Sequence, residues 1–394
     1  MPNEVRLQDL RSAAAIVGIG ETAYRDDYAL VRAGTPRTDA YGYAAAALRG
    51  ALDDAGLRTS DIDGLIAGPA LASERLGEVL GINPRWADQA DAANAVAKAA
   101  QVIHAGLAET VALVYGNDQR AVGTRYGGPG AMGTERHLAY SYFAPWGLTS
   151  QGALYALMAN RYMAETGLTG EQLGAFVASQ RAFAQMNPNA IMTKPLSVDD
   201  YLQSREICTP LRLFDYCLIN DGGVALIVTS AERASDFPAP PVYINALARS
   251  DMNSGATTLE PRLLHYYHPA HREAARQAYA MADLGPGDID SVQIYDSFSI
   301  HIPVALEGFG FCDEGAAGLL AESGATAPGG SLPVNTSGGH LSESYMQGWN
   351  HQVEAVRQVR GQAGTRQVPN TRNVQYISDV AGKVMTIIYG KEPR

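Results

Sequence analysis

Cysteine is absent from the first half of this 394-residue chain. The three cysteines of the sequence are Cys208, Cys217 and Cys312, and their spacing is not that of a metal site. An odd number of cysteines in so long a chain argues against a disulfide framework and indicates a reducing compartment. Enzymes that depend on a cysteine nucleophile in the N-terminal half are therefore excluded.

Charged residues and long apolar runs are scarce too. Only 18% of the residues are charged, and the net charge is −11. Such an acidic protein opposes non-specific binding to nucleic acid or an anionic membrane, so an anionic ligand would need a local arginine and lysine cluster. No stretch reaches the roughly 20 apolar residues of a membrane span, and residues 1–11 lack the apolar core of a secretory signal. We expect a cytoplasmic protein.

The first part of the chain alternates strand-type and helix-type segments. Apolar β-type runs at 13–20, 61–67 and 110–115 predict strands, and alanine-rich stretches at 39–55 and 92–108 predict helices. This alternation predicts an α/β protein with a mostly parallel sheet covered by helices.

A proline-rich break at 236–241 divides the sequence, because its prolines continue neither a helix nor a central strand. We place an N-terminal half at 1–237, with a loop insertion at about 122–215, and a C-terminal half at 238–394. Helices are expected at 154–166 and 169–186 and a strand at 222–229. The second half repeats the plan, with strands at 242–248 and 291–295, helices at 271–282, 301–309 and 345–361, and two antiparallel strands at 374–379 and 382–388.

The glycines at positions 18 and 20 follow a predicted strand and fit the G-x-G-x-x-A form of a dinucleotide fingerprint. A dinucleotide fingerprint needs a helix after its glycines. Residues 24–36 mix polar and apolar residue types and predict no helix. The acidic residue about twenty positions on, Asp39, begins a helix and does not end a second strand. A plain turn is the favoured interpretation.

Two tyrosines mark the chemistry of the C-terminal half. Tyr295 leads the run Tyr-Asp-Ser-Phe at 295–298, and Tyr345 lies in the glycine-rich run 338–348. A phenol with an ordinary pKa near 10 serves as a base only where neighbours stabilise its phenolate, and otherwise it works as an acid or a hydrogen-bond donor.

Together with the opening run 16–20, the segments 61–65 and 99–106 and the run Asn-Thr-Ser-Gly-Gly at 335–339, these motifs resemble the thiolase superfamily, especially its sterol-carrier-protein thiolase-like branch. The likeness extends nearly from end to end. It implies a thiolase fold, in which two pseudo-duplicated α/β/α halves form a five-layer body, and a homodimer.

The sequence departs from that superfamily at its reactive positions. Thiolases carry a nucleophilic cysteine at the N-terminus of a first-half helix, where the helix dipole lowers its pKa; the corresponding stretch here, 86–91, has none. Tyr295 and Tyr345 replace the asparagine or histidine of the two C-terminal motifs. That pair resembles the thiolase-like retro-aldolases of bacterial steroid side-chain degradation.

The resemblance implies an aldolase that cleaves a β-hydroxyacyl-CoA, expected to be a steroid 17-hydroxy side-chain thioester, into a ketone and propionyl-CoA. Retro-aldol cleavage needs a base for the β-hydroxyl, donors for the thioester enolate and an acid for its carbon, but no covalent nucleophile. Tyr295 and Tyr345 are the candidates for proton transfer, with their division of labour open. A thiolase-like lyase or condensing enzyme for another acyl-CoA and a non-catalytic acyl-CoA or sterol carrier are the alternatives.

Four further residues complete the candidate site. His340 could orient a tyrosine, donate to the thioester oxygen, or simply pack on its turn, and Asp296 could anchor its neighbour or cap the next helix. Gly338 and Gly339 could let the backbone approach the thioester. Ser297 is interpreted as a residue at the start of the following helix and not as a nucleophile, because no His/Asp arrangement surrounds it in the sequence.

Two stretches are ambiguous. The histidine-rich run 265–271 lacks carboxylate or cysteine partners at ligand spacing, so a structural or substrate-loop use is favoured over zinc. The tyrosine- and glycine-rich run 126–146 either lines an acyl pocket or forms a subunit interface.

No metal or redox cofactor is implied in this chain, since CoA is part of the substrate. The family resembled here works with a small zinc-ribbon and OB-fold partner, so the resemblance implies a heterotetramer in which any zinc belongs to the partner.

Overall fold

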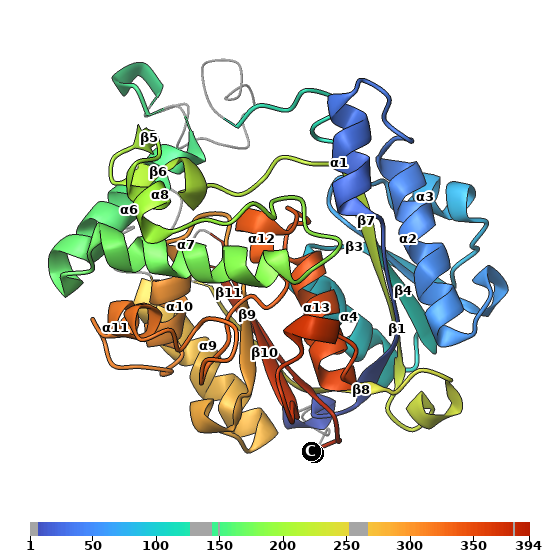
Figure 1. The fold of residues 1–394 in the computed structure, drawn as a ribbon. Helices are drawn as coiled ribbons and strands as arrows, with labels where there is room; N and C mark the ends of the chain where they lie inside the picture. Colours follow the sequence, from blue (N-terminus) through green and yellow to red (C-terminus); the bar gives the residue numbers. More distant parts are fainter. Residues whose placement is uncertain (1–6, 127–143, 149, 252–266, 381–382) are drawn as a thin grey trace.

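The computed structural model describes residues 7–126, 144–148, 150–251, 267–380 and 383–394 (Figure 1). Nine described strands form one mixed sheet in the order β3-β2-β4-β7-β1-β8-β11-β10-β9. Their bounds are β1 (Ala14–Glu21), β2 (Gly64–Ala67), β3 (Trp86–Gln89), β4 (Thr110–Asn117), β7 (Gly222–Ser230), β8 (Val242–Asp251), β9 (Ser291–Ile294), β10 (Asn373–Val380) and β11 (Lys383–Gly390). Two short strands, β5 (Glu206–Cys208) and β6 (Leu211–Arg212), pair separately.

The two halves of the sheet repeat one pairing pattern. In the first half β1 and β4 are both antiparallel to β7, and β4 is parallel to β2. In the second half β8 and β10 are both antiparallel to β11, and β10 is parallel to β9. This repetition is the pseudo-duplication that the order of elements predicted.

The prediction of a mostly parallel sheet was wrong. Antiparallel pairs join all the central strands from β4 to β10, and parallel pairs occur only among β3, β2 and β4 and between β9 and β10. The alternation of helices and strands could not reveal this, because β7 follows the long insertion and enters the sheet in the opposite direction. The sheet continues across the proposed boundary through the pairs Ala15–Tyr243 and Ile16–Val242, so the division at residue 237 stays a prediction.

Helices cover the outer faces of the sheet and fill the space between its two halves. Their bounds are α1 (Tyr24–Arg32), α2 (Ala40–Ala55), α3 (Ser73–Leu80), α4 (Ala92–His104), α6 (Gln151–Thr166), α7 (Gly170–Gln185), α8 (Val198–Leu202), α9 (Tyr267–Ala282), α10 (His301–Gly308), α11 (Ala317–Glu322), α12 (Gly339–Ser342) and α13 (Trp349–Arg360). α2 packs outside β1, β4 and β7, and α9 packs outside β8 and β11. α4 and α13 lie between the two halves of the sheet and contact both (Figure 1). None of the described helices is both long enough and apolar enough to cross a membrane.

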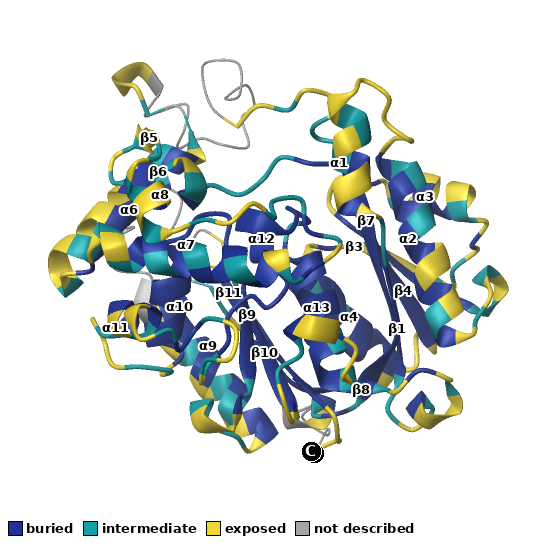
Figure 2. Cartoon of the chain, viewed as in Figure 1, coloured by how far each residue is buried: buried dark blue, intermediate teal, exposed yellow. Residues whose placement is uncertain are grey.

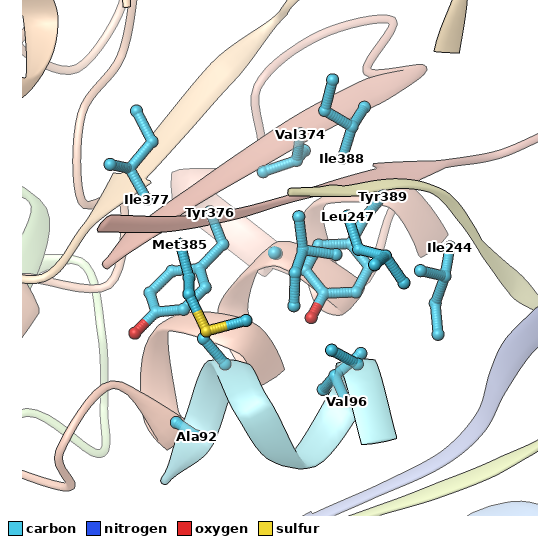
Figure 3. Packing of buried hydrophobic residues seen from close by; sticks show 14 of the residues in the cluster. Ala92, Val96, Ile244, Leu247, Val374, Tyr376, Ile377, Met385, Ile388 and Tyr389 are labelled. Carbon is cyan, nitrogen blue, oxygen red and sulfur yellow. The ribbon is translucent and has the colours of Figure 1, made fainter. Parts of the chain in front are cut away.

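The central layer forms the main core. Figure 3 shows Ala92 and Val96 of α4 under Leu247, Tyr376 and Tyr389 of the second-half strands. Apart from the edge strand β3, the strands of the nine-stranded sheet are buried along most of their length, whereas α2 and α3 expose one face (Figure 2). An interior helix layer between two buried sheet faces explains why the chain has so few charged residues.

The dinucleotide-like glycines serve helix packing. A Cβ on Gly18 would lie 2.4 Å from the carbonyl oxygen of Ala51, and one on Gly20 would lie 2.1 Å from that of Ala47. The backbone of α2 therefore rests directly on β1. One reason given against the fingerprint was wrong, because a helix does follow: α1 spans Tyr24–Arg32. Asp39 caps α2 as predicted, accepting a hydrogen bond from the backbone N–H of Gly42.

We expect Gly20→Ala to destabilise the protein by about 1–3 kcal/mol, because the added methyl group would overlap the α2 backbone. Chemical denaturation measures the change. Gly50→Ala is the matched control, since its Cβ would lie 3.5 Å from Gly20 at an exposed position of α2, where alanine is as good a helix former or better. Equal stabilities for the two variants would contradict this account of the packing.

Candidate active site

Each of the two tyrosines lies in a loop next to the end of a secondary structure element. Tyr295 follows the last residue of β9, and Tyr345 lies between α12 and α13. The prediction of a helix over 345–361 was wrong at its start, because α13 begins only at Trp349. Gln347 (φ 49°) and Gly348 (φ 86°) adopt left-handed backbone conformations that interrupt the helix. The loop conformation, and not a helix face, therefore orients Tyr345.

The two phenol oxygens form a hydrogen bond with each other at 3.1 Å. Both side chains are largely buried, with 7% of Tyr295 and 8% of Tyr345 exposed. Burial raises the pKa of both phenols well above the ordinary value. The backbone of Tyr345 is fixed by Asn220, whose side-chain oxygen accepts its N–H at 2.7 Å. Both phenols are therefore protonated at neutral pH and rigidly paired.

His340 packs against both tyrosines. Its ring contacts Tyr295 edge to face at 4.8 Å between centroids and Tyr345 at 4.9 Å. Its Nε2 accepts the backbone N–H of Gly348 at 2.9 Å, so this nitrogen carries the lone pair and Nδ1 the proton. Burial, with His351 and His301 nearby, lowers the pKa of His340 well below its ordinary value. The histidine is a neutral ring in contact with both tyrosines.

Asp296 connects four elements below the tyrosine pair. It accepts the backbone N–H of His340 at 2.9 Å and the side-chain amide of Gln180 at 3.0 Å. Its Oδ1 also lies 3.3 Å from Nδ1 of His340 and 3.0 Å from Nε2 of His351. Asp296 is fully buried and does not cap α10, whose N-cap residue is Ile300. Of the two expectations, anchoring agrees with the geometry.

Asp296, His340 and His351 also bring three possible metal ligands within 4.8 Å of one another. The tautomer of His340 argues against a metal here. A histidine that binds a metal normally donates its other ring N–H to a neighbour, but Nε2 of His340 is an acceptor and the proton lies on Nδ1, facing Asp296. The group is better described as a buried polar cluster, in which the Asp296 carboxylate accepts the backbone N–H of His340 and the amide of Gln180.

We expect the purified chain to contain zinc, iron and manganese only in substoichiometric amounts, because Nδ1 of His340 has no free lone pair. Elemental analysis of the chain separated from any partner checks this. One equivalent of metal that is lost in His351→Ala would show that the cluster is a metal site after all.

Gly338 and Gly339 lie in the turn that opens α12, both with positive φ. A Cβ on Gly339 would be 2.4 Å from Oδ2 of Asp296, and one on Gly338 would be 2.7 Å from Cβ of Ala184 in α7. Close packing against Asp296 and α7 thus accounts for both glycines. Their contact with a substrate stays a prediction.

A second buried polar cluster lies beside Tyr295 and was missed in the sequence. Oγ of Ser297 is 3.1 Å from Nε2 of His301, and Asp379 lies 3.8 Å from Nδ1 of His301 and 3.1 Å from Nε2 of His271. The spacing of four residues between Ser297 and His301 was the available signal. His271 belongs to the histidine-rich run, and its pairing with Asp379 supports the structural interpretation of that residue; residues 265 and 266 lie outside the described residues.

Cys217 is a further neighbour that sequence reasoning missed. Its backbone N–H donates to the carbonyl oxygen of Ser297 at 3.1 Å. Its thiol lies near enough to raise the pKa of both Tyr295 and Tyr345 if it were ionised, while burial raises its own pKa and keeps it protonated. Cys217 is therefore an uncharged neighbour of the two tyrosines and does not supply an activated thiolate.

The stretch 86–91, which the resemblance matches to the thiolase nucleophile, forms β3 and a helix cap. β3 ends at Gln89, and Asp91 caps α4 by accepting the backbone N–H of Asn94 at 3.1 Å. This carboxylate stabilises the helix N-terminus but cannot replace a thiolate. Arg136 and His137, which belong to the tyrosine- and glycine-rich run 126–146, lie outside the described residues.

Glu343, two residues before Tyr345, is a buried carboxyl group with a raised pKa. It accepts hydrogen bonds from Asn187 at 2.8 Å and from Ser337 at 2.7 Å inside the protein. Burial, with the nearby acids Glu21 and Glu354, raises its pKa to about 8. The loop that carries Tyr345 is therefore held by a carboxyl group that stays protonated at neutral pH.

We expect the free energy of unfolding to fall as the pH rises from about 5 to about 8. The unfolded carboxyl group, with a pKa of about 4.3, has already released its proton there, whereas folded Glu343 keeps it, so the folded state binds more protons. Asp215, whose pKa burial raises to about 6, acts in the same direction. Denaturation at several pH values should show a shallower fall in Glu343→Gln, and equal slopes would contradict the assignment to Glu343.

Known proteins resemble this chain over nearly its whole length. Residues 262–391 match the family described as Thiolase C-terminal domain-like. The chain is 35% identical to the steroid side-chain-cleaving aldolase of Thermomonospora curvata, over 89% of this chain and 91% of that protein. It is 34% identical to the 17-hydroxy-3-oxo-4-pregnene-20-carboxyl-CoA lyase of Mycobacterium tuberculosis, over 89% and 92%.

Solved structures show the same fold. An Ltp2-ChsH2(DUF35) aldolase superposes with a TM-score of 0.85 at 32% identity, covering 97% of this chain and 98% of that one. Human mitochondrial 3-ketoacyl-CoA thiolase superposes with a TM-score of 0.69 at 13% identity, covering 97% and 99%, which shows the fold alone. The thiolase fold predicted from the sequence is confirmed.

Proposed function

Since the chain belongs to the thiolase-like family of steroid side-chain-cleaving aldolases, we propose that it cleaves a steroid β-hydroxyacyl-CoA by a retro-aldol reaction. The bond between the α-carbon and the β-carbon breaks, the hydroxyl-bearing carbon becomes a ketone, and the α-carbon leaves as a thioester enolate. Protonation of that enolate gives the shortened acyl-CoA, which is propionyl-CoA for a three-carbon side chain. The reaction is redox-neutral.

The observation that carries this proposal is the hydrogen bond between Tyr295 and Tyr345. Retro-aldol cleavage removes one proton from the substrate hydroxyl and returns one to carbon, so the net proton count does not change. Two protonated phenols in contact can pass protons along: one accepts the hydroxyl proton while it gives its own to the other, which protonates the enolate carbon. Neither phenol then has to exist as a free phenolate, which its raised pKa would disfavour.

The surroundings favour proton transfer over nucleophilic catalysis. His340 is neutral and packs against both tyrosine rings, and Asp296 accepts the backbone N–H of His340. These contacts support a positioning role for both residues, and the proposal leaves catalysis to Tyr295 and Tyr345. Gly338 and Gly339 are proposed to flank the thioester.

Phenylalanine variants test the two tyrosines. We expect Tyr295→Phe and Tyr345→Phe each to lower kcat by about 10²–10⁴-fold, the usual contribution of a general acid or base, with folding unchanged because each ring stays buried. Mass spectrometry of the ketone and the shortened thioester measures turnover. Near-normal cleavage by either variant rejects that tyrosine, and Tyr115→Phe, a buried tyrosine that stacks on Trp349, serves as a matched control.

Neither alternative agrees as well with the site. Thiolysis and condensation through an acyl-enzyme need the cysteine that the α4 N-terminus lacks. A non-catalytic carrier needs no pair of hydrogen-bonded phenols. Incubation with the β-hydroxyacyl-CoA and detection of a ketone without consumption of free CoA separates these functions.

We also propose a homodimer that binds a small zinc-ribbon and OB-fold partner as a heterotetramer. The support is the high similarity to an Ltp2-ChsH2(DUF35) aldolase over the whole chain. Zinc, in that arrangement, belongs to the partner, and this chain needs no cofactor besides the CoA of its substrate.

We expect the chain expressed alone to be poorly soluble or inactive, because the partner would cover part of its surface and complete the site. Co-expression with the partner, followed by size-exclusion chromatography and an activity assay, checks this. Full activity of the isolated chain would argue against an obligatory partner.

A further inference from the structure

A serine, a histidine and an aspartate lie in a buried row beside Tyr295, and the proposed proton transfer does not use them. Oγ of Ser297 lies 3.1 Å from Nε2 of His301, and Nδ1 of His301 lies 3.8 Å from the carboxylate of Asp379. The three residues come from the loop after β9, the start of α10 and β10. The fold thus places one polar group against each ring nitrogen of His301, whose side chain is fully buried.

The carboxylate of Asp379 fixes one side of the His301 ring. Burial alone would raise the pKa of Asp379, but His271 and His301 outweigh burial and hold that pKa below its ordinary value. The carboxylate is therefore ionised, and Nδ1 of His301 carries a proton toward it, because a lone pair there would be repelled. On the other side, Nε2 of His301 pairs with the Ser297 hydroxyl. These two contacts define the orientation of the ring.

The ring of His301 packs edge to face against the ring of Tyr295. Their centroids are 5.8 Å apart and their planes are inclined by 84°. The ring of His340 meets Tyr295 at 4.8 Å, also with an inclination of 84°. Tyr155 of α6 contacts the His301 ring at 4.7 Å. Two histidine rings, each beside a different buried aspartate, therefore contact the ring of Tyr295.

We propose that His301, oriented by Asp379 and Ser297, is a positioning residue that holds the ring of Tyr295 for proton transfer; this inference rests on the proposed function. The transfer joins two phenol oxygens that are 3.1 Å apart, so a small movement of one ring interrupts it. A misplacement of about 1 Å is enough to lower a rate by roughly 100-fold. Contact with a ring that is itself fixed from both sides limits such movement of Tyr295.

The order serine, histidine, aspartate is also that of a nucleophilic serine, but two features favour positioning. The 3.8 Å between His301 and Asp379 is an ion-pair distance and exceeds that of a hydrogen bond. The same carboxylate oxygen lies closer to Nε2 of His271, at 3.1 Å. Asp379 is thus shared between two histidines and is not dedicated to His301.

The test is His301→Asn, which removes the ring from Tyr295 and keeps a side-chain N–H donor on the side of Asp379. We expect kcat for ketone release to fall roughly 10–100-fold with KM nearly unchanged, as for a displaced catalytic group. The full chain is used, with its partner where activity requires it. An unchanged kcat would overturn the inference.

His271→Asn is the matched control. His271 is as buried as His301 and lies beside the same carboxylate, but its ring contacts Phe309, at 6.0 Å between centroids. Both variants should lose stability in chemical denaturation, whereas the large loss of kcat should be confined to His301→Asn. Equal losses of kcat would overturn the inference, because disturbance of Asp379 would then explain both.

The Tyr295→Phe background shows whether His301 acts through the tyrosine. Adding His301→Asn to Tyr295→Phe should lower kcat further by less than about twofold, because residues that act as a unit are not additive. A further loss as large as that caused by His301→Asn alone would mean that His301 acts independently of Tyr295, and it would overturn the inference.

Ser297 supplies a second variant and a direct test for a nucleophile. Ser297→Ala removes one polar contact of the His301 ring and keeps the ring, so it decides the matter if His301→Asn does not fold. We expect a smaller loss of kcat at unchanged KM, and an unchanged kcat in Ser297→Ala would then overturn the inference. Covalent labelling of Ser297 by a fluorophosphonate probe, found by peptide mass spectrometry, would overturn it too.

The two proposals fail in different ways. A wild-type chain that releases no ketone from the β-hydroxyacyl-CoA rejects the aldolase function, and with it this inference. A wild-type chain that releases the ketone, together with a His301→Asn variant of equal kcat, rejects the positioning role alone.

Discussion

The buried side chain of Asp296 is the interaction on which the rest of the site depends. It joins the end of β9 to α7 through Gln180, to α12 through the backbone of His340, and to α13 through His351. A buried acceptor of this kind is costly unless every neighbour donates to it, so the four elements must meet in one arrangement. That arrangement sets the phenol of Tyr295 against the phenol of Tyr345.

The loss of the cysteine nucleophile and the gain of the phenol pair belong to different halves of the duplicated sheet. The α4 N-terminus, where a thiolate would be stabilised, carries the cap Asp91, and the two tyrosines proposed to transfer protons lie in the loops after β9 and before α13. In the proposed reaction, proton transfer between neutral groups replaces covalent attack. Burial of the two phenols is compatible with it, because no ion has to be stabilised in the resting enzyme.

Most elements could be predicted from their sequence, and the failures have physical causes. α2 and α7 both begin at side-chain caps, and both were located to within a residue or two. The direction of β7 depends on where the long insertion returns the chain, which no local pattern records. The start of α13 depends on left-handed backbone at Gln347 and Gly348, where a Cβ on Gly348 would meet the Tyr376 hydroxyl at 2.0 Å, a contact between residues far apart in the chain.

By itself, the sequence determined which chemistry was excluded and which side chains were available: no cysteine before Cys208, and tyrosines at both motif positions. Residue identity suffices for that, because a missing functional group cannot be restored by folding. Only the tertiary structure decided that the phenols touch, that His340 is neutral and packs against both of them, and that Ser297, His301 and Asp379 lie together. Hydrogen-bond partners and protonation states follow from burial and from neighbours distant in sequence, and these exist only once the chain has folded.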